Sequence, residues 1–107
     1  MRKSLLAAAL SVAISTVLAQ STEHVVSQKG KAFSTKVLTV KVGDTVSFRN
    51  DDPFFHNIFS LSSGNDFDLG SYPQGQSRKT TFNKEGTFDV ECAIHPEMKM
   101  VVKVEKK

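Results

Sequence analysis

A thiolate, an imidazole and a thioether occur within seven residues near the C-terminal end of this 107-residue chain. They belong to Cys92, His95 and Met98, in the run Cys-Ala-Ile-His-Pro-Glu-Met. A second imidazole, that of His56, follows an apolar segment upstream, from which it can join the set on a neighbouring strand. Two imidazoles and a thiolate around a metal, with a weak thioether on the axis, form the site that electron-transfer copper prefers. We therefore predict that these four residues bind one copper ion, which cycles between Cu(I) and Cu(II).

Cys92 is the only cysteine of the chain, which excludes a disulfide within the monomer. On the oxidising side of a membrane, such a thiol is either buried and inert or held as a thiolate by a metal. The neighbouring His95 and Met98 favour the metal. Zinc also accepts a cysteine and two histidines, but its structural sites need a fourth strong ligand, for which only Glu97 is near. Methionine is a poor ligand for zinc, so copper is favoured over zinc.

Two methionines compete for the axial position. Met100 shares strand parity with Val102 and Val104, which predicts a core side chain. Met98 lies in the preceding loop and is therefore the predicted axial ligand. The remaining histidine, His24, has no ligand spacing to any other residue and is expected at the surface.

Short apolar runs separated by turn residues must position these side chains. Strands are expected over residues 37–42, 45–48, 58–61, 78–82, 87–92 and 100–105. Gly43-Asp44 predicts a hairpin turn between the first two strands, and the polar composition of residues 62–75 predicts a surface loop. Cys92 has the same strand parity as two apolar residues, so its side chain is expected to face the core. No helical periodicity follows the first nineteen residues, and the pattern predicts an antiparallel all-β sandwich or barrel.

The first nineteen residues have the pattern of an export signal. Arg2 and Lys3 precede an uncharged apolar run that ends at Ala19, which predicts cleavage before Gln20. As a helix, the fifteen apolar residues would span roughly 22 Å, which is short of the roughly 30 Å hydrocarbon core and disfavours a transmembrane anchor. We predict a periplasmic protein without a membrane anchor after cleavage, composed of a signal peptide, 1–19, and one domain, 20–107.

The charge balance argues against nucleic acid as a partner. The formal net charge of +3 includes Arg2 and Lys3, and without them the chain has 12 basic and 11 acidic residues. No run of lysine and arginine interleaved with aromatic residues remains to follow a phosphate backbone. The sequence also contains no Ser-His-Asp, paired-carboxylate or phosphate-loop arrangement, and an axial methionine would block the open position that a catalytic metal needs. An enzyme is therefore not expected.

The residues around the predicted ligands resemble the cupredoxins, the small type 1 blue copper proteins. The resemblance rests on His56-Asn57, on Cys92-x-x-His95-x-x-Met98 before a valine-rich strand, and on residues 40–50. The two-residue gap between His95 and Met98 resembles that of amicyanin-like members, and the loop also resembles plastocyanin-like proteins, although plastocyanins themselves have a longer gap. The resemblance covers nearly all of residues 20–107.

This resemblance implies a Greek-key β-sandwich with copper at one end, bound by the four predicted ligands. It implies that the backbone N–H of Asn57 donates to the Cys92 sulfur. Many relatives have Ser or Thr where this chain has Ala93, so the Asn57 side chain is expected to bond to backbone or water instead. Electrons are expected to enter at the outer edge of His95, among apolar residues, with Phe54 more exposed than Phe55.

The function implied is that of a periplasmic carrier of single electrons between redox proteins, such as a c-type cytochrome and a periplasmic dehydrogenase or reductase. A monomer with small, transient interfaces is expected. The alternative is a periplasmic copper-binding protein for copper resistance or delivery. A metal-free interaction module with an inert cysteine is the third interpretation, and the ligand spacing disfavours it.

Overall fold

The computed structural model describes residues 21–107. The predicted signal peptide, 1–19, and the predicted first residue of the mature domain lie outside the described residues. The described chain forms eight strands and no helix, so it has no helix that could span a membrane. The strands are β1 (Glu23–Gln28), β2 (Val37–Lys41), β3 (Thr45–Asn50), β4 (His56–Ser60), β5 (Phe67–Tyr72), β6 (Ser77–Thr81), β7 (Gly86–Cys92) and β8 (Lys99–Glu105).

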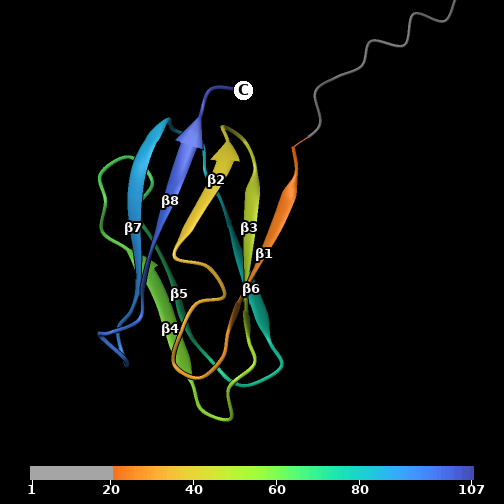
Figure 1. The fold of residues 1–107 in the computed structure, drawn as a ribbon, viewed down its shortest axis with the longest axis vertical. Helices are drawn as coiled ribbons and strands as arrows, with labels where there is room; N and C mark the ends of the chain where they lie inside the picture. Colours follow the sequence, from red (N-terminus) through yellow and green to blue (C-terminus); the bar gives the residue numbers. More distant parts are fainter. Residues whose placement is uncertain (1–20) are drawn as a thin grey trace, which may run out of the picture.

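Two sheets face each other (Figure 1). The smaller sheet has three strands in the order β1-β3-β6, and the larger has five in the order β2-β8-β7-β4-β5. The all-β sandwich prediction is therefore confirmed. The sheets are mixed rather than purely antiparallel, because β1 pairs parallel to β3 and β2 pairs parallel to β8.

The hairpin predicted at Gly43-Asp44 is wrong. The chain does turn there, with Gly43 at φ +94° and the N–H of Asp44 donating to the carbonyl of Lys41 at 2.9 Å. However, β2 belongs to the larger sheet and β3 to the smaller one. The turn residues indicate that the chain reverses, but β2 finds its partner in β8 at the far end of the sequence, which a local turn pattern cannot reveal.

The loop predicted over residues 62–75 is also wrong, because β5 lies inside it and forms one edge of the larger sheet. The register between β4 and β5 shifts opposite Ile58, and Gly70 has φ +72° within this bulge. Phe67 and Leu69 pack against the core before the bulge, and Tyr72 is buried after it. The bulge thus moves the apolar positions from one parity to the other, and this hides the strand from a search for simple alternation.

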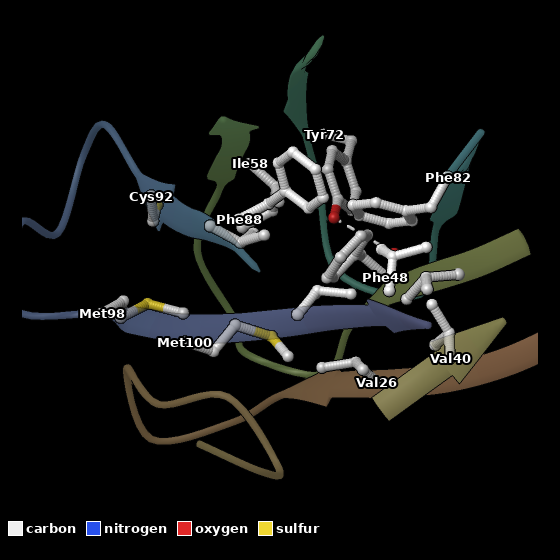
Figure 2. Close-up of a cluster of buried hydrophobic side chains, with 14 residues drawn as sticks. Val26, Val40, Phe48, Ile58, Tyr72, Phe82, Phe88, Cys92, Met98 and Met100 are labelled. Carbon is white, nitrogen blue, oxygen red and sulfur yellow. Dashed lines mark hydrogen bonds between the residues drawn. The ribbon is translucent and has the colours of Figure 1, made fainter. Parts of the chain in front are cut away.

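The core fills the space between the two sheets (Figure 2). As strand parity predicted, Cys92 faces inward, and Met100 lies on the buried face of β8. Cys92 and Met98 lie at one end of the cluster, whereas Val40 and Phe82 lie toward the other (Figure 2). The buried apolar residues apart from Cys92 and Met98 are Val26, Val40, Val46, Phe48, Ile58, Tyr72, Phe82, Phe88, Val90, Met100, Val102 and Val104.

Candidate metal centre

His56, Cys92 and His95 meet at one end of the sandwich. His56 is the first residue of β4 and Cys92 the last of β7, and these antiparallel strands are neighbours, with Ile58 opposite Cys92. The Cys92 Sγ lies 3.6 Å from His56 Nδ1 and 3.8 Å from His95 Nδ1. One donor atom from each residue lies within 4.8 Å of the other two. The sequence prediction that a thiol and two imidazoles converge is therefore realised in the fold.

Met98 lies in the turn that leads into β8 and is almost fully buried. Its N–H donates to the His95 carbonyl at 2.9 Å, and its carbonyl accepts from the Cys92 N–H at 3.3 Å. These two hydrogen bonds fix Met98 to the segment that also carries Cys92 and His95. Met100 lies farther along β8 among core residues (Figure 2).

Asp52, which was not among the predicted site residues, also belongs to this site. Its Oδ2 lies 2.8 Å from His56 Nε2, and both side chains are buried. Because a carboxylate accepts this hydrogen bond, Nε2 is the protonated ring nitrogen and Nδ1 is free to face Cys92. The only signal in the sequence is an acidic residue four positions before the histidine, which is too common a pattern to single out.

The Asp52 carboxylate also accepts hydrogen bonds from two backbone N–H groups, those of Gly30 at 2.7 Å and Lys31 at 3.1 Å. Burial raises the pKa of Asp52, but the hydrogen bond from His56 and those from the two backbone groups outweigh it, so that the pKa lies below its ordinary value. Asp52 is therefore a buried anion at neutral pH.

The segment after His56 is tied to Cys92 by backbone bonds. The N–H of Asn57 donates to Cys92 Sγ at 3.3 Å, as the family resemblance implied, and the N–H of Ala93 donates to the Asn57 carbonyl at 2.9 Å. The Asn57 side chain donates to the Ser71 hydroxyl at 3.4 Å. This side-chain partner was not expected, because the sequence did not reveal that β5 places Ser71 opposite Asn57.

The outer rim of the site consists of half-buried and exposed apolar side chains around His95. The Phe54 ring packs against both imidazoles, with centroids 5.4 Å from His56 and 5.1 Å from His95. Phe55 is 53% exposed and Ile94 is 48% exposed. The expectation that Phe54 is the more exposed phenylalanine was therefore wrong. Residues 53–55 precede the first residue of β4, so strand alternation does not govern them.

His24 lies at the other end of the sandwich and is not part of the site. It is partly buried rather than fully exposed, because its Nε2 lies 2.9 Å from Asp44 Oδ2.

The donor set fits copper. Thiolate, imidazole and thioether are the ligands that favour copper, and the three converging donors include no carboxylate. Glu97, the candidate fourth ligand for zinc, is exposed and is not part of the converging group.

Comparisons with known proteins agree with this geometry. The family described as copper binding proteins, plastocyanin/azurin family, matches residues 20–106. Amicyanin from Paracoccus denitrificans is 36% identical over 80 residues, which are 68% of this chain and 58% of that protein. The chain thus spans less than two thirds of that relative's length.

Solved structures show the same architecture. A Cu(I) form of an amicyanin mutant superimposes with a TM-score of 0.72 and 30% identity, covering 78% of this chain and 82% of that one. The copper-containing nitrite reductase of Thermus scotoductus gives a TM-score of 0.74 and 29% identity, but the match covers 79% of this chain and only 23% of the enzyme.

Proposed function

The chain belongs to the plastocyanin/azurin family of copper-binding proteins, and from this membership we propose that it carries single electrons between redox proteins in the periplasm. In this proposal residues 1–19 are a cleaved signal peptide and residues 20–107 are the mature domain. The observation that supports it most directly is the Cys92 thiol, which lies 3.6 and 3.8 Å from two imidazole nitrogens.

We propose that His56, Cys92, His95 and Met98 hold the copper. When bound, copper supplies a one-electron couple between Cu(II) and Cu(I). The chain keeps the donors in place in both states, because His56 and Cys92 belong to paired strands. Backbone hydrogen bonds restrain the loop between Cys92 and Met98. Little then has to move when an electron arrives.

The proposed route for electrons is the half-buried ring of His95. Exposed apolar side chains surround it, and they could contact a partner without strong charge recognition. Redox partners of this kind meet through small interfaces of less than about 1,200 Å². The similarity to amicyanin supports a periplasmic dehydrogenase or reductase and a c-type cytochrome as the partners proposed. The exposed residues of this rim are Pro53, Phe55, Ile94 and Pro96.

We propose no catalytic activity for the chain. Four protein ligands leave no open coordination position for a substrate. The similarity to nitrite reductase covers less than a quarter of that enzyme and does not support transferring its activity.

The test is visible absorption after loading with Cu(II). We expect an intense thiolate-to-copper band that disappears in Cys92→Ser, because serine cannot supply the sulfur. His24→Gln is the control and should keep the band, since His24 lies away from the site. A colourless Cu(II) complex of the unaltered protein would contradict the proposal. Fast, reversible voltammetry is expected of a carrier, whereas slow, irreversible cycling would favour copper resistance or delivery.

A further inference from the structure

Asp52 is a buried acid that the four-ligand set does not use. It is 3% exposed, and its neighbour His56 is fully buried. Its backbone is fixed as well, because the N–H of Asp52 donates to Asn50 Oδ1 at 2.8 Å. The carboxylate therefore has little freedom to turn away from His56.

A tight turn delivers the two backbone donors to Asp52. Gly30 has φ +66° and Lys31 has φ +58°, the only positive φ of a non-glycine residue among the described residues. Left-handed backbone is unfavourable for lysine, so the surrounding structure must hold it there. In this conformation both successive N–H groups point at the carboxylate, an arrangement that binds anions. The Gly30-Lys31 turn thus stabilises the negative charge of the Asp52 carboxylate next to His56.

We propose that Asp52 is a positioning residue that orients His56 and lowers the reduction potential of the copper site. The inference rests on the proposed function. The hydrogen bond at 2.8 Å keeps the proton on Nε2 and leaves Nδ1 facing Cys92. A carboxylate behind a histidine ligand also makes the imidazole a stronger donor.

The effect on the potential follows from charge. Reduction adds one electron to the copper and no proton, so a nearby fixed anion favours the more positive Cu(II) state. Asp52 is shielded from solvent, and its interaction with the site is screened little by salt. Asp51 carries the same charge one residue earlier, but its side chain is 33% exposed and paired with Arg49 at 2.9 Å. The two aspartates therefore offer a matched comparison.

The first experiment measures the potential of copper-loaded Asp52→Asn and Asp51→Asn by voltammetry. Asp52→Asn should keep the visible band and raise the potential by at least about 59 mV, which corresponds to a tenfold change in the Cu(II)-to-Cu(I) equilibrium. Asp51→Asn should change that equilibrium less than about twofold, because solvent screens its charge. Equal shifts in the two variants, or no shift in Asp52→Asn, would overturn the effect on potential.

A second measurement needs no variant. In the metal-free protein, ¹⁵N NMR of the neutral His56 ring should show the proton on Nε2 and a bare Nδ1. The opposite tautomer would overturn the orienting role, and this result holds even if Asp52→Asn fails to fold. The two proposals fail separately, because a missing visible band in the unaltered protein contradicts the copper carrier, whereas the tautomer decides the role of Asp52.

Discussion

The two methionines near the site differ in what surrounds each thioether. Met98 is fixed by backbone hydrogen bonds to His95 and Cys92, so it moves with the candidate ligands. Met100 is buried on β8 within the hydrophobic core. A weak thioether ligand holds copper between the geometries that its two oxidation states prefer. Their environments therefore assign different roles to two chemically identical side chains.

Replacing each methionine separates these roles. Met98→Leu should keep the visible band, because the thiolate remains, but raise the potential, because Cu(II) loses a donor. Met100→Leu conserves volume and should cost less than about 1.5 kcal/mol of stability while leaving the potential unchanged. Voltammetry and urea unfolding of both variants provide the test. The reverse result would make Met100 the axial ligand.

Residue types and spacing were enough to predict that His56, Cys92 and His95 converge, because the loop that follows Cys92 is short and His56 begins a neighbouring strand. They could not predict Asp52. Its role depends on the Gly30-Lys31 turn, more than twenty residues away along the chain, being folded against it. The exposures of Phe54 and Phe55 were predicted in the wrong order for a similar reason, since contact with two imidazoles decides them.

Among the strands, β5 links the two sheets through one side chain. The buried hydroxyl of Tyr72 accepts a hydrogen bond from Gln28 Nε2 of β1 at 3.1 Å. It donates one to the Phe48 carbonyl of β3 at 3.1 Å (Figure 2). Burial raises the pKa of Tyr72 to about 12, so the hydroxyl keeps the proton that it donates. β5, an edge strand of the larger sheet, is thereby hydrogen-bonded to both β1 and β3 of the smaller sheet.

Removing this hydroxyl should weaken the sandwich. Tyr72→Phe leaves the buried Gln28 amide without its partner, which should lower the free energy of unfolding by about 1–3 kcal/mol. The control, Ser63→Ala, removes an exposed hydroxyl and should change stability by less than about 0.5 kcal/mol. Urea unfolding of the metal-free variants measures both. If Tyr72→Phe had the same free energy of unfolding as the control, the hydrogen bonds of the Tyr72 hydroxyl would not contribute to stability.

The strands with clear alternation, β7 and β8, were predictable from the sequence, because each buries every second residue. β1 was not, since Val25 and Val26 are its only apolar residues and Val25 is exposed. β5 was hidden by its bulge, and the pairing of β2 with β8 brings together segments about sixty residues apart. Side-chain parity is encoded locally, whereas strand partners are chosen by the whole chain.

At the scale of the whole molecule, a second buried carboxylate, that of Asp44, lies at the end of the sandwich away from the metal centre. Asp44 accepts hydrogen bonds from the N–H of Thr22 and of Lys41 and contacts the ring of His24. Burial raises the pKa of Asp44, but these hydrogen bonds outweigh it and lower the pKa from 3.8 to about 2. Asp44 thus ties the start of β1 to the turn between β2 and β3.

The lowered pKa predicts a loss of stability in acid. Because the folded protein holds Asp44 ionised more strongly than the unfolded chain does, its contribution is complete above about pH 4 and disappears as the pH falls toward 2. When the pH is lowered from 4 to 2, the free energy of unfolding of Asp44→Asn should therefore fall less than that of the unaltered protein. Asp66→Asn, an exposed control, should follow the unaltered protein. Parallel curves for all three metal-free proteins would contradict this role.

Both ends of the described chain emerge where Asp44 lies. β1 begins beside Thr45, and the Lys107 ammonium approaches Gly43. The start of β4 and the end of β7, which carry His56 and Cys92, lie at the opposite end of the sandwich (Figure 1). A tether attached ahead of β1 or after β8 would therefore join the protein at the end of the sandwich that is opposite the His95 rim. On an electrode, either attachment would leave the His95 rim accessible to a soluble partner.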